Sequence, residues 1–319
     1  MELSGSIFIY CHSMQFEIVI LGCGAATPTV RHLPTAQAIN WNGRWMLIDA
    51  GEGVQLSLRK EQIPFQKIDR IFISHMHGDH IFGLPGLIGS MALLGRTKEL
   101  KLYGPEKLEA YVHHTLKISE THLKFPLAYH RNDSEKFQSI HEEHGTEITA
   151  FPVKHRIEAF GYKFNYEAPQ WNIRRSMIEE KGLLRHEIIE LKKGIDVLRQ
   201  DGTMLSASNT CHPKPAPICY VYSGDTRPCD NILIAAKHAS LLYHEATFLD
   251  DKKAIAKKTG HSTARQAGQI AQEANVNELL IGHFSSRYRN EQLLVTEAKE
   301  VFDNVHLARE GLRWRLGIQ

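Results

Sequence analysis

Short apolar runs separated by turn signals characterise the start of the chain. Residues Phe16–Leu21 form a nearly continuous apolar run, which is typical of a strand buried on both faces. Two further apolar segments, Ala36–Trp41 and Trp45–Ile48, flank the dipeptide Asn42-Gly43, which favours a tight hairpin. The pattern therefore predicts a β-meander at the start of the fold.

Strand-like and helix-like segments alternate in the rest of the chain. Further strands are predicted at Arg70–Ile73, Leu100–Tyr103, Phe125–His130, Glu147–Val153, Phe160–Tyr166, Ile218–Tyr222, Ser240–Tyr243 and Leu279–Ile281. Helices are predicted at Val54–Arg59, Ile81–Leu94 with an interruption at Pro85, Glu106–Ile118, and Ala264–Ala274 after the cap-like Ser262-Thr263. Two comparable β-rich halves with outer helices indicate an α/β fold, a four-layer αββα sandwich.

A change of pattern between residues 169 and 200 predicts an insertion. Two helix-like segments separated by Gly182 replace the strand pattern there, and Asp201-Gly202 follows them. We interpret residues 169–200 as a helical arm inserted into one domain of residues 14–319. Residues 1–13 precede the first predicted strand, carry no motif, and are interpreted as an N-terminal extension.

Composition excludes several classes of protein. Hydrophobic residues make up 42% and charged residues 23% of the 319 positions, which argues against wholesale disorder. The formal net charge of +2 is too small for nucleic-acid binding by charge alone, so any RNA surface is expected to be local. The five cysteines are odd in number and show no CxxC spacing, which favours a reducing, cytoplasmic compartment. No apolar run has membrane-spanning length, so no membrane anchor is expected.

The high histidine count is the compositional feature that points to chemistry. There are 19 histidines, most of which are expected on the surface, but three lie in the segment His75-Met76-His77-Gly78-Asp79-His80. His75 and His77 point the same way if the backbone is extended, and Gly78 allows a turn before Asp79 and His80. Imidazole and carboxylate groups are zinc ligands, so this segment predicts a metal site.

Four ligands are too few for two metal ions, and later strand ends supply more candidates. His155, Asp225 and His283 each follow a predicted strand. Loops at strand ends are where such folds place functional residues. Taken singly, each residue has an alternative interpretation as a cap, a turn residue or a surface residue.

These residues lie in motifs that resemble a known family. HMHGDH, FPVKH ending at His155, YSGDT around Asp225 and GHFSSRY around His283 resemble the metallo-β-lactamase superfamily and, more narrowly, the short-form ribonuclease Z family. The segments His244–Thr247 (HEAT) and His261–Thr263 (HST) resemble two further loops of that family. The resemblance extends over nearly the whole chain after Met14.

The resemblance implies a dinuclear zinc site, with Mn²⁺ as a possible substitute. One ion would be held by His75, His77 and His155, the other by Asp79, His80 and His283, with Asp225 bridging. The implied activity is endonucleolytic removal of 3′ trailers from precursor tRNA after the discriminator base, leaving a tRNA 3′-hydroxyl and a trailer 5′-phosphate.

The resemblance also implies catalytic roles for three residues. Asp79 would accept a proton from the attacking water, and His261, oriented by Glu245, would protonate the departing 3′ oxygen. For Glu245 and His261, a buried structural ion pair is the alternative.

The same resemblance implies contacts with RNA and a homodimer in which one subunit's arm presents RNA to the other's site. Candidate RNA contacts are Arg174 and Arg175 in the arm, Arg31 in a loop that only partly matches the family's, and Arg287 with Tyr288 beside His283. A solvated helical hairpin and an ordinary surface turn are the alternatives for the arm and for Arg287 with Tyr288.

Two other functions stay open at this point. A related metallohydrolase acting on a small phosphodiester or ester would share the metal site. A non-catalytic RNA-binding relative would have lost metal ligands, whereas this sequence retains all those that the resemblance implies.

Overall fold

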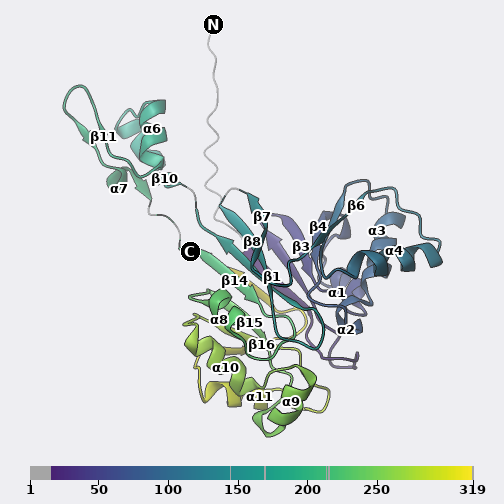
Figure 1. The fold of residues 1–319 in the computed structure, drawn as a ribbon. Coiled ribbons are helices and arrows are strands. Elements are labelled where there is room, and N and C mark those ends of the chain that lie inside the picture. Colours follow the sequence, from purple (N-terminus) through teal and green to yellow (C-terminus); the bar gives the residue numbers. More distant parts are fainter. Residues whose placement is uncertain (1–15, 144, 169, 213, 215, 318–319) are drawn as a thin grey trace.

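Two seven-stranded sheets form the centre of the molecule (Figure 1). The computed structural model describes residues 16–317 except 144, 169, 213 and 215; the predicted extension of residues 1–13 lies outside them. The first sheet has the order β18-β1-β2-β3-β4-β5-β6, and the second has the order β17-β16-β15-β14-β9-β8-β7. Each sheet is antiparallel in one half and parallel in the other.

The strands of the first sheet are β1 (Phe16–Gly22), β2 (Ala36–Trp41), β3 (Arg44–Ile48), β4 (Ile68–Phe72), β5 (Leu100–Gly104), β6 (Leu127–Arg131) and β18 (Arg313–Leu316). Those of the second are β7 (Gln138–Glu143), β8 (Thr146–Pro152), β9 (Phe160–Tyr166), β14 (Ile218–Tyr222), β15 (Leu241–Glu245), β16 (Leu279–Gly282) and β17 (Val305–Leu307). The helices of the body are α1 (Val54–Lys60), α2 (Gly78–Ile81), α3 (Leu84–Leu93), α4 (Leu108–Ile118), α8 (Asp230–Ala236), α9 (Lys253–Thr259), α10 (Ala264–Glu273) and α11 (Gln292–Lys299).

Alternating side chains of the central strands separate two apolar cores. In β1, Ile18 and Ile20 belong to the core between the sheets, whereas Val19 and Leu21 pack in the core beneath α1, α3 and α4. The helices α8, α10 and α11 cover the outer face of the second sheet. Burial on both faces explains the nearly continuous apolar run of β1. The predicted four-layer αββα sandwich is confirmed.

Several elements differ from the sequence-based expectations. The helix expected at Ile81–Leu94 begins at Leu84 instead, with Pro85 in the first turn of α3, and Ile81 is the last residue of the separate helix α2. The break occurs at Gly83, where an added Cβ would lie 2.2 Å from the carbonyl oxygen of Gly51. The short or polar elements β7, β17, β18, α8, α9 and α11 were not predicted, since they lack a clear apolar period.

The start of α10 agrees with the cap expected there. The hydroxyl of Thr263 accepts a hydrogen bond from the Gln266 amide, and the Gln266 side chain accepts one from the Thr263 amide, at 3.3 and 3.0 Å. This reciprocal capping box defines where the helix begins.

The chain segment that connects β9 to β14 forms a small lobe, which stands apart from the sandwich (Figure 1). It contains β10 (Asn172–Ile173), α5 (Arg175–Glu180), α6 (Arg185–Lys192), β11 (Val197–Leu198), β12 (Met204–Leu205), α7 (Ala207–Thr210) and β13 (Cys211–His212). The two helices expected on either side of Gly182 are present, and the lobe continues past Gln200. Its two sheets pair only two residues per strand, too short for a sequence period to reveal.

The lobe, called the arm below, has an apolar core of its own. Leu191 is fully buried there, among Ile173, Leu183 and Leu205. In the part of the chain that the structure describes, no helix has the length and apolar character needed to cross a membrane.

Leu191→Ala is expected to destabilise the arm locally by about 2 to 5 kcal/mol, because it leaves a cavity in this small core. Hydrogen exchange of the α6 amides should become faster. Ile189→Ala is the matched control on the same helix, since Ile189 is 47% exposed. Equal exchange in the two variants would contradict a packed arm core.

Candidate metal centre

The carboxyl ends of parallel strands from both sheets meet at one edge of the sandwich. In the first sheet, β3 leads to Asp49 and β4 leads to His75. In the second, β14, β15 and β16 lead to Asp225, Glu245 and His283. Ligand sites of open α/β sheets lie outside the carboxyl ends of the strands, so the topology brings these side chains together.

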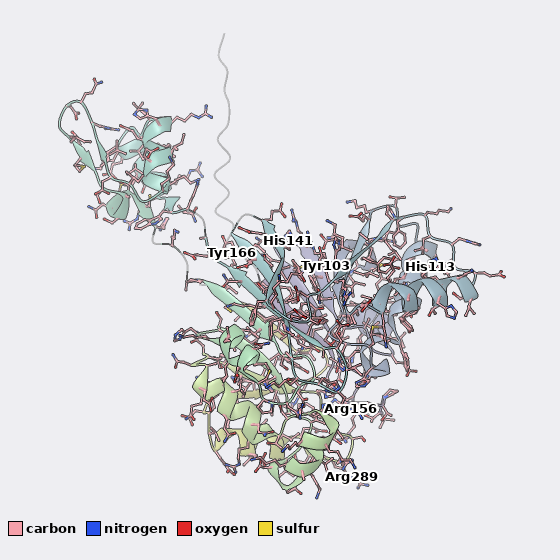
Figure 2. The ribbon with its side chains drawn as sticks, in the orientation of Figure 1. Tyr103, His113, His141, Arg156, Tyr166 and Arg289 are labelled. Atoms are coloured by element: carbon pink, nitrogen blue, oxygen red, sulfur yellow. The ribbon has the colours of Figure 1, made fainter. Side chains whose placement is uncertain are left out.

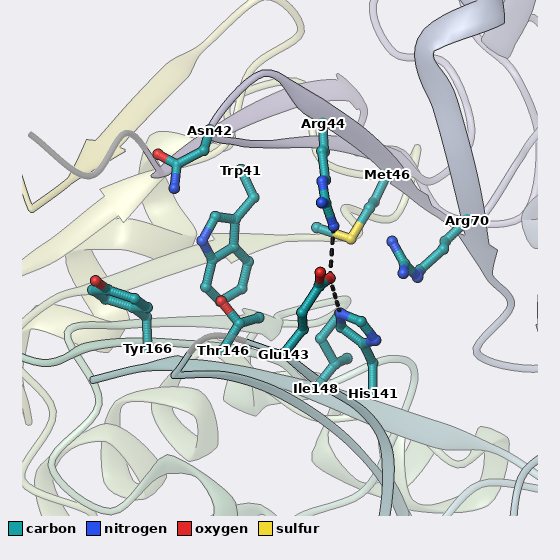
Figure 3. Close-up of a pocket in the computed structure, with 10 residues that line it drawn as sticks. All are labelled: Trp41, Asn42, Arg44, Met46, Arg70, His141, Glu143, Thr146, Ile148 and Tyr166. Atoms are coloured by element: carbon teal, nitrogen blue, oxygen red, sulfur yellow. Dashed lines mark hydrogen bonds and ion pairs between the residues drawn. The ribbon is translucent and has the colours of Figure 1, made fainter. Parts of the chain in front are cut away.

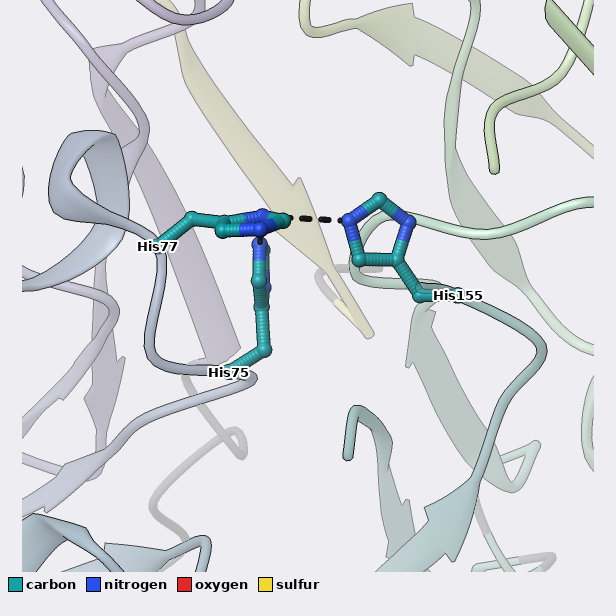
Figure 4. Close-up of side chains that lie close together, drawn as sticks. All are labelled: His75, His77 and His155. Carbon is teal, nitrogen blue, oxygen red and sulfur yellow. Dashed lines mark hydrogen bonds between the residues drawn. The ribbon is translucent and has the colours of Figure 1, made fainter. Parts of the chain in front are cut away.

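Three imidazoles form the first donor group (Figure 4). His77 Nδ1 lies 3.0 Å from His75 Nε2 and 3.1 Å from His155 Nε2. Burial, and next the neighbouring His155, lower the pKa of His77 to about 4, and burial also lowers the pKa of His155. The rings are therefore neutral near pH 7, as metal ligation requires.

Asp79, His80, Asp225 and His283 form the second donor group. Asp225 Oδ2 lies between the two groups, at 3.4 Å from His80 Nε2, 3.2 Å from His283 Nε2 and 3.6 Å from His75 Nε2. The structure thus brings together all the residues that the sequence predicted as metal ligands, and Asp225 Oδ2 lies close to members of both groups.

The donor set fits divalent cations. The Nε2 atoms of His80 and His283 are buried, and neither makes a well-oriented hydrogen bond, although Asp225 Oδ2 lies 3.4 and 3.2 Å away. Unsatisfied buried nitrogens are costly, and a cation would satisfy both. Nitrogen and carboxylate ligands suit zinc and also manganese.

Asp49, which the sequence analysis did not single out, holds one of these ligands. Its Oδ2 lies 2.7 Å from His80 Nδ1 and accepts hydrogen bonds from Ser74 Oγ and Tyr222 Oη at 2.8 and 2.7 Å. A carboxylate behind a ligand histidine orients the ring and selects the tautomer. Its position directly after β3, before Gly51, was the available signal.

The imidazole rings of His155 and His283 are also oriented by hydrogen bonds at Nδ1. His155 Nδ1 lies 2.8 Å from the carbonyl oxygen of Gly260, and His283 Nδ1 lies 2.8 Å from Thr247 Oγ1. Gly260 and Thr247 belong to the two loops that contain the HST and HEAT motifs. These loops therefore contribute to the metal centre as well as supplying Glu245 and His261.

Glu245 and His261 form a hydrogen-bonded pair beside the donor groups. His261 Nδ1 lies 2.8 Å from Glu245 Oε1, and Glu245 Oε2 accepts a 2.7 Å hydrogen bond from Thr247 Oγ1. Burial lowers the pKa of His261, but Glu245 outweighs burial and raises it to about 9. Because Nδ1 is engaged, Nε2 is the nitrogen of His261 that can deliver a proton to a substrate.

Two residues of the site have a strained backbone conformation. Asp49 and His283 have φ values of 56° and 60°, in the left-handed region that residues other than glycine seldom adopt. Each follows a strand directly, so this conformation turns the chain sharply. Such strain is common where the surrounding structure imposes a functional orientation.

A cavity of about 850 Å³ opens over the donor groups. Asp225, His261 and His283 line it, together with two arginines, Arg156 and Arg287. Figure 2 shows Arg156 on the part of the body remote from the arm, whereas Tyr166 lies at the end nearest the arm. Arg156 was not predicted, although it directly follows the ligand His155.

The predicted RNA contacts differ in their surroundings. Arg287 lines the cavity, with its guanidinium 5.4 Å from the ring centre of Phe248. Arg31 is engaged by Glu291 at 2.5 Å, and Tyr288 Oη accepts a hydrogen bond from the Leu249 amide at 2.9 Å. These contacts hold Arg31 and Tyr288 in place, and neither of them lines the cavity over the donor groups.

In the arm, Arg174 Nε donates to the carbonyl oxygen of Cys211 at 3.2 Å, whereas Arg175 is exposed. Arg175 is therefore available for contacts with a partner molecule, and Arg174 already stabilises the pairing of β10 with β13.

A second cavity, of about 500 Å³, contains none of the predicted site residues (Figure 3). It lies between β2, β3 and β4 on one side and β7, β8 and β9 on the other. Glu143 Oε2 lies 2.7 Å from Arg44 Nη1, so these two charges compensate each other within the cavity, and it lies 3.6 Å from His141 Nε2.

Comparisons with known proteins show to which family this chain belongs. A Ribonuclease Z of Bacteroides fragilis is 40% identical over 298 residues, which cover 93% of this chain and 98% of that protein. A Ribonuclease Z of Porphyromonas gingivalis is 38% identical, with 93% and 98% covered. A family model described as "Anti-Pycsar protein Apyc1" matches residues 16–168, which is less than half of the chain.

Two solved structures are similar along nearly their whole length. The short form of human tRNase Z has a TM-score of 0.69 and 25% identity, and 95% of this chain and 100% of that chain are covered. The metallo-β-lactamase fold protein YhfI of Bacillus subtilis has a TM-score of 0.66 and 20% identity, with 95% and 99% covered, and it supports the fold alone. Because the bacterial relatives align with almost the entire chain, which also has the motifs and the fold expected of them, the chain belongs to the ribonuclease Z family.

Proposed function

We propose that this chain is a metal-dependent endoribonuclease that removes 3′ trailers from precursor tRNA after the discriminator base. The observation that carries the proposal is the meeting of two metal-donor groups with the Glu245–His261 pair in one cavity. Membership of the ribonuclease Z family supports the choice of substrate. The products would be a tRNA 3′-hydroxyl and a trailer 5′-phosphate.

The proposed ligands of two Zn²⁺ ions are the residues of the two donor groups, with Asp225 between them. Mn²⁺ is an acceptable substitute for the same donor set. When bound, such a pair of cations lowers the pKa of a water molecule and offsets the negative charge of the scissile phosphate.

The chain's own residues would manage the protons of the hydrolysis. Asp79 Oδ2 is fixed by a 2.7 Å hydrogen bond from the Ala26 amide, and it accepts the proton of the attacking water. His261 donates its Nε2 proton to the 3′ oxygen as the phosphorus–oxygen bond breaks. Glu245 holds the ring in position and stabilises its charged form.

Arg156 and Arg287 at the cavity are suited to bind the phosphates that flank the cleavage site. The arm would contact the tRNA at a distance from the cut. The arm is attached to the end of β9 at Tyr166 and to the start of β14 at Ile218. The candidate metal centre lies beyond Tyr222, at the opposite end of β14. We therefore propose a homodimer in which the arm of one subunit holds RNA for the site of the other, in the cytoplasm.

The first test maps the products of a 3′-extended precursor tRNA at single-nucleotide resolution. We expect a cut next to the discriminator in the wild type and none with His77→Ala, together with reduced metal content, because His77 Nδ1 contacts both other members of its group. His113→Ala, at an exposed position on α4, is the control. If the wild type spares precursor tRNA but hydrolyses bis(p-nitrophenyl) phosphate, a small-substrate phosphodiesterase replaces the proposal.

Substitution of His261 tests its role as the proton donor. His261→Ala should slow precursor tRNA cleavage by about 10²- to 10⁴-fold, since a ribose oxygen is a poor leaving group without a proton. Hydrolysis of bis(p-nitrophenyl) phosphate should change far less, because p-nitrophenolate leaves without protonation. Metal content should be retained. A parallel loss on both substrates would indicate a structural role for the His261–Glu245 pair.

Charge removal in the arm tests its contact with RNA. Arg175→Ala combined with Arg185→Ala, both at exposed positions, should raise KM for precursor tRNA and leave small-phosphodiester hydrolysis unchanged. The slope of log affinity against log salt should fall by about 1 for each lost phosphate contact. Glu179→Gln, also exposed on α5, is the control. An unchanged KM and salt slope would exclude these two arginines as RNA contacts.

A further inference from the structure

A second type of metal-donor cluster lies outside the catalytic cavity. Cys23 directly follows β1, His32 belongs to the loop before β2, and Glu310 lies in the turn between β17 and β18. Cys23 Sγ is 3.5 Å from His32 Nδ1 and 3.6 Å from Glu310 Oε1, and these last two atoms are 3.2 Å apart. The Cys23 and Glu310 side chains meet although they are 287 positions apart in the chain.

The three distances lie within about 0.1 Å of the edges of a zinc coordination tetrahedron. Zinc–sulfur bonds of about 2.3 Å and zinc–nitrogen or zinc–oxygen bonds of about 2.0 to 2.1 Å give ligand–ligand separations of about 3.3 to 3.6 Å at tetrahedral angles. The sulfur edges are the longer ones here, as the longer zinc–sulfur bond requires. One ion placed among the three atoms would therefore lie at a bonding distance from each of them.

We propose that Cys23, His32 and Glu310 bind a third divalent cation of the zinc class, distinct from the two of the catalytic centre. A Cys23 thiolate and a Glu310 carboxylate would together neutralise the cation, and His32 would bind as a neutral ring. A neutral complex suits the environment, because Cys23 is fully buried and the side chains of His32 and Glu310 are only 15% and 21% exposed. Binding releases the thiol proton to solvent.

The surroundings of the cluster support ligation. Glu291 Oε1 lies 3.2 Å from His32 Nε2, on the side of the ring opposite the cluster, which is the usual carboxylate support of a ligand histidine. The Leu33 amide donates to Glu310 Oε1 at 3.1 Å and fixes that carboxylate. A cavity of about 390 Å³, lined in part by His32 and Glu310, provides an entry path and room for a water at the fourth position.

Such an ion would be structural and would stabilise loops that border the catalytic cavity. It would join the loop after β1 to the turn before β18. The Cys23 carbonyl oxygen accepts from the Phe284 amide at 2.9 Å, directly after the ligand His283. In the same loop, the Ala26 amide donates to Asp79. The proposed site is nevertheless independent of the proposed activity, since none of its three ligands lines that cavity.

Cobalt substitution distinguishes this site from the catalytic one. The catalytic donors are nitrogen and oxygen atoms, so a thiolate-to-cobalt charge-transfer band in the near ultraviolet would come from a cysteine ligand. We expect this band in the Co²⁺-loaded wild type and in His77→Ala. It should disappear in Cys23→Ser and persist in Cys219→Ser, which removes another buried thiol.

Metal counting gives a second readout on the full-length protein. After dialysis against zinc, the wild type should retain about three ions per chain, and Glu310→Gln about two. Absence of the charge-transfer band from the wild type, or its persistence in Cys23→Ser, would overturn the proposal. A wild-type content of about two ions per chain would also overturn it. The thiol, imidazole and carboxylate would then be a hydrogen-bonded cluster without a metal ion. Both decisive wild-type measurements are independent of whether the variants fold.

Discussion

Buried negative charge at one edge of the sandwich is the constraint on which the site depends. Asp49, Asp225 and Glu245 are at most 3% exposed, and the side chain of Asp79 is 11% exposed. An uncompensated buried carboxylate costs several kcal/mol, so each one needs a positive partner or a set of hydrogen-bond donors. Imidazoles, backbone amides and hydroxyl groups surround all four, and two divalent cations would complete the compensation.

The carboxylates divide into two kinds by what they contact. Asp79 and Asp225 face the donor groups directly. Asp49 and Glu245 lie behind them, where Asp49 orients His80, and Glu245 orients His261 and, through Thr247, His283. Fixed orientation matters here because a ligand ring turned away from its metal leaves both the nitrogen and the cation unsatisfied.

The sheet topology allows both kinds of carboxylate to meet. Each sheet supplies parallel strands whose ends reach the same edge, and the antiparallel strands β9 and β14 extend to the opposite end, where the arm is attached. The candidate metal centre and the proposed RNA-holding arm therefore lie at opposite ends of β14. The arm has its own core, so it can differ in sequence without disturbing the metal centre.

The sequence by itself determined the central strands, the candidate metal-binding residues and the two loops around Glu245 and His261. Apolar period and short motifs are local properties, and burial on both faces of a strand such as β1 leaves a clear local pattern. The tertiary structure alone decided that Asp49 supports His80, that Arg156 lines the cavity, and that Cys23 meets Glu310. Tyr222 and Asp49 are 173 positions apart, and Cys23 and Glu310 are 287 apart. Such contacts depend on how the two sheets pack and where their connections close, which no local pattern of side chains encodes.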